Sequence, residues 1–154
     1  MKVWRVARAF RARTPASAFD GNGGLRAPGR WHSIGRRVVY TAKSESLAKL
    51  ETLGHLLPGE MPNLVLVQGI IPDDAVGRVA PPYPAGWDSV PEGDGSRGIG
   101  DRWLEARTSL ALEVPSIHSN SEMNVLINPA HADFGRITIS TPVPFAFDAR
   151  LIGR

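Results

Sequence analysis

The carboxylate of Glu51 occupies the position in this sequence that most favours chemistry. Leu47, Leu50, Glu51 and Gly54 are spaced i, i+3, i+4 and i+7, so in a helix they share one face. Burying a carboxylate in an apolar stripe without a partner is unfavourable. The spacing therefore predicts that Glu51 reaches the edge of the helix, is paired, or lines a cleft where its charge is used.

Two more side chains precede this helix closely enough to share such a cleft. Tyr40 closes a short apolar segment that leads into the helix, which would place its ring near the mouth of the cleft. An ordinary core or rim aromatic is the alternative interpretation. Arg30 follows Gly29, whose lack of a side chain would let a bulky anion approach the backbone.

Basic residues are concentrated in the N-terminal quarter of the chain. Residues 1–37 contain nine Lys and Arg residues against one acid, Asp20, although the net charge of the whole chain is only +3. Fifteen of the 18 basic residues are Arg, whose planar guanidinium binds phosphate and carboxylate bidentately. The pattern favours a phosphate-bearing ligand, either a nucleotide or a nucleic acid. A GC-rich genome's preference for Arg is the alternative explanation.

The residue types exclude or disfavour several kinds of site. The chain has no cysteine, which rules out a disulfide, a thiolate metal ligand and a thiol nucleophile. Ser116 lacks the Gly-x-Ser-x-Gly pattern of a nucleophile elbow, and no phosphate-binding Gly-rich signature is present. Glu51 and His55 lie one helical turn apart, but the histidines are scattered rather than paired, at His32, His55, His118 and His131. We expect no metal.

The sequence is typical of one folded domain over residues 1–154 in the cytoplasm. Its hydrophobic fraction is 42%, enough for a packed core. The N-terminus lacks a charged segment followed by an apolar one, and no stretch approaches the roughly 18 apolar residues of a membrane helix.

The elements expected to position these residues are mostly strands. A helix capped by Ser44 should run to about Leu57, where Pro58 and Gly59 stop it. Strands are expected near residues 3–6, 37–40, 64–71, 109–114, 124–127 and 137–140, with Phe145, Phe147 and Leu151 packing a terminal strand. Many strands, few helices and no βαβ rhythm predict an α+β fold with a mixed or mostly antiparallel sheet and a few flanking helices.

Two long segments rich in Gly or Pro are expected to be loops. Residues 12–29 carry three glycines close together and are predicted to be mobile. Residues 72–100 are rich in Pro and Gly and could form a lid anchored by Trp87, followed by a short helix over residues 101–106. The apolar segment 64–71 is predicted to be the central strand.

Short segments along nearly the whole chain form a recognisable series: Trp4-Arg5-Val6, Gly29-Arg30-Trp31-His32, Val38 to Ala42 with Ser44, Leu47 and Glu51, Gly100-Asp101 with Trp103-Leu104, Val114-Pro115-Ser116, and Asn124 to Pro129 with His131. Taken together, these segments resemble the RES domain family, which is named for its Arg, Glu and Ser. The match covers nearly the whole chain in the family's order, and it is the joint order and spacing that carry it. One departure is that the common Gly-Gly-Arg-Trp-Asn form is Pro28-Gly29-Arg30-Trp31-His32 here.

The resemblance implies an ADP-ribosyltransferase-like fold and a toxin of a type II toxin-antitoxin system that cleaves NAD and needs no metal. It implies an Xre-type helix-turn-helix antitoxin as partner and allows a homodimer within their complex. By position, the catalytic residues would be Arg30, Tyr40, Glu51 and Ser116. Arg5 would be a second phosphate or ligand contact, and Asn124 a weaker candidate that shapes a loop.

Cleaving the nicotinamide–ribose bond of NAD develops positive charge on the ribose, as in glycoside hydrolysis. Glu51 would stabilise that charge or hold the ribose hydroxyls. Arg30, helped by Arg5, would bind the pyrophosphate, Tyr40 would stack on or orient the nicotinamide half, and Ser116 would bond the carboxamide or ribose. The acceptor is left open between water, phosphate and a protein side chain.

Two functions of other classes compete with this hypothesis. The Arg-rich first quarter could track the phosphates of a nucleic acid, as in a binding module or ribonuclease. Alternatively, the cleft could receive a partner peptide without any catalysis.

Overall fold

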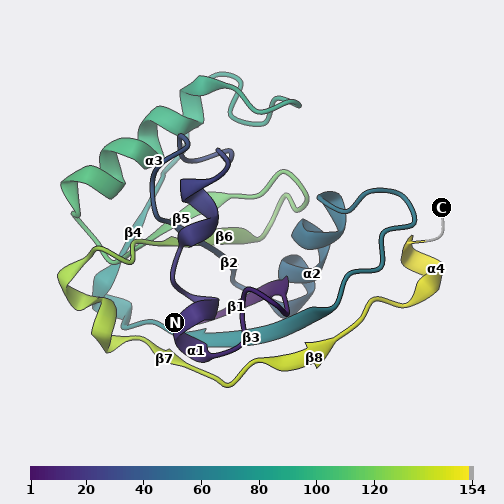
Figure 1. Ribbon diagram of the computed structural model, residues 1–154. Coiled ribbons are helices and arrows are strands. Elements are labelled where there is room, and N and C mark those ends of the chain that lie inside the picture. Colours follow the sequence, from purple (N-terminus) through teal and green to yellow (C-terminus); the bar gives the residue numbers. More distant parts are fainter. Residues whose placement is uncertain (153–154) are drawn as a thin grey trace.

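The computed structural model describes residues 1–152, which form one curled sheet flanked by short helices (Figure 1). The order of its strands is β4-β5-β6-β2-β1-β3-β7, and β8 pairs with β3 beside β7. Only β4 and β5 pair in parallel, so the predicted α+β fold with a mostly antiparallel mixed sheet is confirmed. The strands are β1 Lys2–Arg8, β2 Val39–Ala42, β3 Leu64–Ile70, β4 Val76–Arg78, β5 Ala111–Pro115, β6 Met123–Ile127, β7 Thr138–Ile139 and β8 Val143–Phe145.

Two helices of ten or more residues lie on the sheet within this part of the chain. In α2, Glu45–Gly54, the hydroxyl of Ser44 accepts a hydrogen bond from the backbone N–H of Leu47 at 3.0 Å, the N-cap that the sequence predicts. The other is α3, Asp94–Ala106, which ends at Arg107 in the left-handed conformation. The shorter elements are α1 Pro15–Ala18, α4 Ala149–Ile152 and the 3₁₀ segments η1 Asn22–Leu25, η2 Asp73–Ala75 and η3 Ala132–Arg136.

Alternation along the strands assigns α2 and α3 to the same face of the sheet. Ala42 packs against Leu47 and Ala48 of α2, while Leu126 packs against Trp103 and Leu104 of α3. The opposite face carries the larger apolar core around Val3, Phe19, Val39, Val125 and Ile127. Helix α2 therefore covers the β1 and β2 end of this face, and α3 covers the β5 and β6 end.

The sheet opens between β1 and β2. These strands share a single paired position, Trp4 with Ala42, whereas β2 pairs with β6 over four positions. The carbonyl of Tyr40 instead accepts a hydrogen bond from Nη1 of Arg5 at 2.9 Å. A guanidinium therefore takes the place of ladder hydrogen bonds where the two strands separate.

The structure corrects several local predictions. Residues 12–29 contain α1, closed by a capping box between Thr14 and Ser17, and the η1 turn, so the segment is ordered by local hydrogen bonds rather than a featureless loop. Residues 72–100 contain η2, β4 and the first half of α3, which leaves only residues 79–93 as irregular chain. Glycines at three positions of α3 hid this helix from the sequence pattern.

Three further predictions about packing were wrong. Strand β3 lies near one edge of the sheet rather than at its centre. Helix α2 ends at Gly54, and Leu50 is 42% exposed, because the buried side of the helix is formed by Leu47 and Ala48. At the C-terminus, Leu151 is exposed in α4, and Ile152 packs in its place. Among residues 1–152, no helix has the length and apolar character needed to cross a membrane.

Candidate functional site

Glu51 projects from the second turn of α2 and is held there by two hydrogen bonds to one oxygen. Oε1 accepts from the hydroxyl of Ser116 at 2.6 Å and from Nδ2 of Asn124 at 2.7 Å. The other oxygen, Oε2, faces Nε2 of His118 at 3.8 Å. The Glu51 side chain is 24% exposed, so its charge is fixed in place yet open on one side to the cavity described below.

Ser116 and Asn124 reach Glu51 because β5 and β6 are neighbours. Ser116 follows Pro115, the last residue of β5, and Asn124 lies on β6 opposite both Val114 and Ala42. The Ser116 hydroxyl accepts a hydrogen bond from the backbone N–H of His118 at 3.0 Å, which leaves its own hydrogen for Glu51. Asn124 lies in the strand predicted over residues 124–127, and it holds Glu51 directly, so the alternative that it only shapes a loop is wrong.

Tyr40 is the centre of a hydrogen-bonded network that fastens the loop before β2. Its hydroxyl accepts from the backbone N–H of Trp31 at 3.1 Å and lies 2.9 Å from Nδ1 of His32. Nε2 of His32 lies 3.1 Å from the carbonyl of Ala27, which can only accept, so Nε2 carries the hydrogen and Nδ1 accepts from Tyr40. A Cβ on Gly29 would lie 2.7 Å from the Tyr40 hydroxyl oxygen, so this close packing needs glycine there.

Burial determines the protonation of both rings. It raises the pKa of the Tyr40 hydroxyl far above its ordinary value, and the hydrogen bond from Trp31 offsets only part of the effect. Burial also lowers the pKa of His32, against the opposing effect of its bond to Ala27. Neutral Tyr40 and neutral His32 are therefore the stable forms, which is what their shared hydrogen bond requires.

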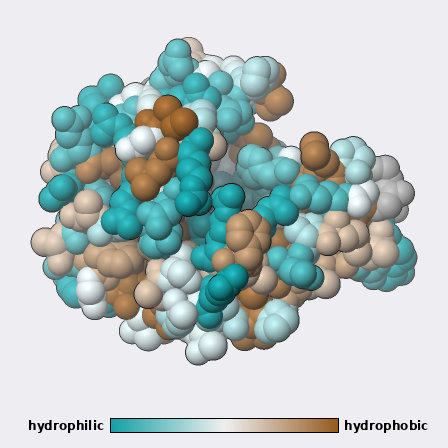
Figure 2. Space-filling model, viewed as in Figure 1, coloured by the Kyte–Doolittle hydropathy of each residue, from teal (hydrophilic) through white to brown (hydrophobic). Residues whose placement is uncertain are grey.

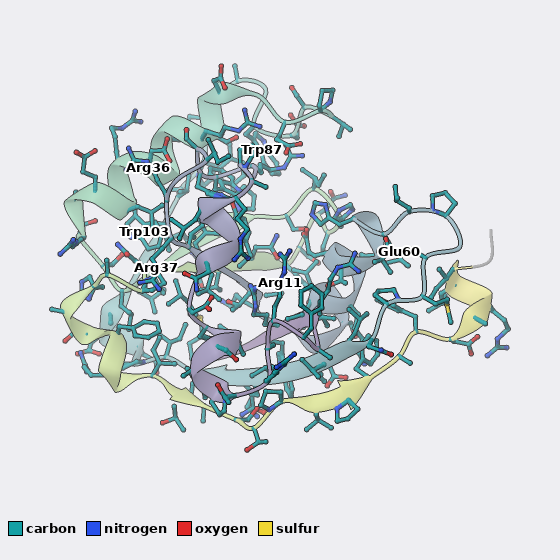
Figure 3. The ribbon with its side chains drawn as sticks, in the orientation of Figure 1. Arg11, Arg36, Arg37, Glu60, Trp87 and Trp103 are labelled. Carbon is teal, nitrogen blue, oxygen red and sulfur yellow. The ribbon has the colours of Figure 1, made fainter. Side chains whose placement is uncertain are left out.

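Arg30 connects the β2 side of the site to the 79–93 segment. Its Nη1 donates to the carbonyls of Trp87 at 2.7 Å and Ser89 at 2.9 Å. The Trp87 ring lies 6.4 Å from that of Trp31 and 5.3 Å from that of Tyr83, measured between ring centroids. Trp87 thus anchors the segment, as expected, and Figure 3 shows it beside the N-terminal end of α3.

Arg5 lies deeper than a surface phosphate contact would. Desolvation by burial lowers its pKa, and the charge of Asp20 offsets part of that. Nη1 is bound to the Tyr40 carbonyl, while Nε is enclosed and has no hydrogen-bond partner. Arg5 therefore forms the inner end of the site.

One cavity of about 580 Å³ joins these side chains, a size typical of small-molecule sites. Figure 2 shows a hollow on this face with hydrophilic residues at its border. Ser116 lies behind Glu51 and lines a neighbouring cavity of about 500 Å³ instead. Of the residues predicted from the sequence, those lining the main cavity are Arg5, Arg30, Tyr40, Glu51 and Asn124.

Arg11 and His118 line the same cavity without having been predicted to act there. Figure 3 shows Arg11 between the N-terminal segment and α2. Gly54, one turn after Glu51, makes room for His118, since a Cβ there would lie 2.8 Å from its Nε2. Neither Arg11 nor His118 belongs to a local sequence motif. The excess of Arg near the N-terminus was the only sequence signal, and it applies to Arg11 alone. Over residues 1–152 no group of three or more His, Asp and Glu side chains is arranged to hold a metal ion.

Comparison with known proteins gives one consistent result. The family model described as "RES domain" matches residues 2–148. A Sphingobium protein named "Prs ADP-ribosylating toxin" is 38% identical over 154 residues, covering 97% of this chain and 95% of its own. Proteins named "Toxin Res" are 39% identical in Yersinia enterocolitica, over 88% of this chain and 91% of theirs, and 36% identical in Pseudomonas putida, over 98% and 99%.

Proposed function

This chain belongs to the RES domain family, and from that premise we propose that it is a toxin that cleaves the nicotinamide–ribose bond of NAD and transfers the ADP-ribosyl group. The observation that carries the proposal is the single cavity that contains Glu51, Tyr40 and the guanidinium groups of Arg5 and Arg30. A carboxylate fixed beside several cations suits a substrate that carries two phosphates and develops a positive centre as it reacts.

Glu51 would supply the charge that the reaction needs. As the bond between C1′ of the ribose and the pyridine nitrogen breaks, the electron pair stays with the nitrogen, nicotinamide leaves neutral, and positive charge develops on the ribose. The two hydrogen bonds on Oε1 fix the carboxylate before the substrate binds, so Oε2 is free to face the ribose. Such a fixed charge stabilises the transition state more than the ground state.

The arginines would hold the pyrophosphate. Arg30 and Arg11 both line the main cavity, and each hydrogen bond from a guanidinium to a phosphate contributes roughly 1.5–3 kcal/mol. Arg30 is itself oriented by the carbonyls of Trp87 and Ser89, which leaves Nε and Nη2 for a ligand. NAD is a substrate in this proposal, and the groups named supply the chemistry without a metal.

The acceptor would approach across Ser116 and His118, which separate the main cavity from its neighbour. The Sphingobium relative is named an ADP-ribosylating toxin, which favours transfer of the ADP-ribosyl group to an acceptor such as a protein side chain. Water and phosphate are the other acceptors, and they would give net hydrolysis or phosphorolysis of NAD. In each case the attacking atom bonds to C1′ as nicotinamide leaves, and an acceptor that is protonated gives up its proton.

A chain with this activity needs an inhibitor. We therefore also propose that a cytoplasmic Xre-type helix-turn-helix antitoxin pairs with it and closes the main cavity. The name "Toxin Res" on the Yersinia and Pseudomonas relatives supports a toxin, and the family resemblance supports this type of partner.

The arrangement of basic residues weighs against the nucleic-acid alternative. Arg8 pairs with Glu60, and Arg36 pairs with Asp101 at 3.2 Å. Arg5 donates to the carbonyl of Tyr40, and Arg30 to the carbonyls of Trp87 and Ser89. Four of the nine cations of residues 1–37 are therefore committed to separate contacts within the protein, which weakens the case for a strip that follows a phosphate backbone.

The direct test is to incubate the purified chain with NAD and identify the products by mass spectrometry. We expect free nicotinamide together with ADP-ribose or an ADP-ribosylated acceptor protein from added lysate. A reaction that leaves NAD intact with and without lysate would refute the proposal.

A further inference from the structure

A side pocket of about 170 Å³ opens beside the main cavity at the point where β1 and β2 separate. The two spaces share Arg5, Tyr40, Glu51, His55 and Asn124 as wall residues. The remaining walls are largely apolar, formed by Trp4, Val6, Ala42 and Ala48 together with Thr41 and Thr52. A space of about 150 Å³ is known to hold a benzene molecule, so one six-membered ring fits here.

Two residues that line the side pocket carry the unpartnered buried side-chain polar atoms found in residues 1–152. They are Nε of Arg5 and Oδ1 of Asn124. Glu51 can only accept, so the hydrogen bond between Asn124 and Glu51 fixes Nδ2 toward the carboxylate and leaves Oδ1 on the other side. One orphan is thus a donor and the other an acceptor. Buried polar groups are rarely left unpaired, and such exceptions call for a physical explanation.

A primary carboxamide complements this pair of atoms. Its oxygen accepts one hydrogen bond and its NH₂ group donates. On the premise of the proposed function, we propose that the side pocket binds the nicotinamide ring of NAD, with Nε of Arg5 donating to the carboxamide oxygen and Oδ1 of Asn124 accepting from its NH₂ group. The two protein atoms expose almost no surface to water, so their side chains rotate slightly as the ring enters.

This assignment gives Asn124 two tasks at once. Nδ2 donates a hydrogen bond to the carboxylate of Glu51, and Oδ1 accepts one from the carboxamide of the departing nicotinamide. One side-chain amide therefore aligns the catalytic charge with the bond that breaks. In this assignment Arg5 binds the carboxamide of the nicotinamide ring, whereas the sequence suggested that it binds a phosphate.

The test compares NAD with its 3-acetylpyridine analogue, which keeps the carbonyl oxygen but has a methyl group instead of NH₂. In the wild-type chain, kcat/KM for NAD should exceed that for the analogue by about 10- to 100-fold, because the analogue leaves Oδ1 of Asn124 unpaired. In Asn124→Ala this preference should fall by at least about tenfold. Ser116→Ala is the matched control, since it also removes one hydrogen bond from Oε1 of Glu51 but should keep the wild-type preference.

Each outcome is decisive, because any intrinsic difference in reactivity between the two leaving groups is common to all variants. If Ser116→Ala loses the preference for NAD as fully as Asn124→Ala does, Oδ1 of Asn124 does not bind the carboxamide. If Asn124→Ala does not fold, the same comparison is made with Asn124→Ser. A preference as large as that of the wild-type chain overturns the assignment, and a preference lowered by at least about tenfold supports it. A chain that cleaves neither dinucleotide refutes the proposed function instead.

Discussion

Replacing Glu51 by Gln removes the proposed catalytic charge while preserving the shape of the side chain. Both hydrogen bonds of Glu51 are made to Oε1, from Ser116 and Asn124, and a glutamine oxygen can accept both. The amide nitrogen then occupies the position of Oε2, where His118 lies 3.8 Å away without a hydrogen bond to lose. The variant should therefore fold as the wild-type chain does.

The expected loss of activity follows from the charge alone. A unit charge about 4 Å from the developing positive centre contributes about 4 kcal/mol at an effective dielectric constant of 20. The side chain is 24% exposed, and solvent screening reduces this value. We therefore expect turnover to fall by at least about 100-fold, or about 2.7 kcal/mol. Two hydrogen bonds that lose their charged acceptor should lower the free energy of unfolding by about 1–2 kcal/mol.

The assay is nicotinamide release under saturating NAD, with circular dichroism and thermal unfolding to show that the variant is folded. Glu45→Gln is the matched control, because Glu45 lies on the same helix and pairs with Lys49 near the surface. That change should cost only about 0.3–0.5 kcal/mol of stability and leave turnover unchanged. A folded Glu51→Gln chain that keeps turnover within about fivefold of the wild type would refute the role given to this carboxylate.

Three more predictions concern the walls of the site. Arg30→Ala should raise the Kd for NAD by about 10- to 100-fold through lost phosphate contacts, measured by calorimetry; an unchanged Kd would argue against a phosphate clamp. Tyr40→Phe should lower the free energy of unfolding in urea by about 1–3 kcal/mol, because Nδ1 of His32 loses its buried partner, and equal stability would show that the hydrogen bond contributes nothing. Because burial lowers the pKa of His32, the folded chain binds a proton there less readily than the unfolded chain. This contribution to stability is complete above about pH 6.5 and is lost as the pH falls, so His32→Gln should flatten the decline in unfolding free energy between about pH 6.5 and 5.

The sequence predicted that Glu51 shares an apolar helix face with Leu47 and Leu50, of which Leu47 is buried and Leu50 is exposed. The spacing of apolar residues in α2 is consistent with more than one buried side, since Leu47, Ala48 and Leu50 lie around much of the helix. The choice is made by the sheet, where Ala42 and the ring of Trp4 leave room for Leu47 and Ala48. Local periodicity contains no information about the surface against which a helix packs.

The partners of Glu51 lie still further from local prediction. Ser116 and Asn124 are 65 and 73 residues away in the chain. They meet the carboxylate because β6 pairs with both β2 and β5, a register that no motif in either segment encodes. The family resemblance supplied Ser116 by position, but it could not show that Asn124 shares the same oxygen or that Arg5 lies beneath the site.

The opening between β1 and β2 explains why the site lies where it does. Because the strands pair only at Trp4 and Ala42, the Tyr40 carbonyl needs another donor, and the Arg5 guanidinium supplies it. Continued pairing of the strands would satisfy that carbonyl and close the side pocket beneath α2. The separation of the two strands thus places the Arg5 guanidinium at the inner end of the site. Asn124 of β6 and Ser116 hold Glu51 at the same site. Of the two carboxylate oxygens of Glu51, Oε1 accepts both hydrogen bonds and Oε2 accepts none from the described residues. Oε2 is therefore the oxygen available to a substrate that enters the cavity.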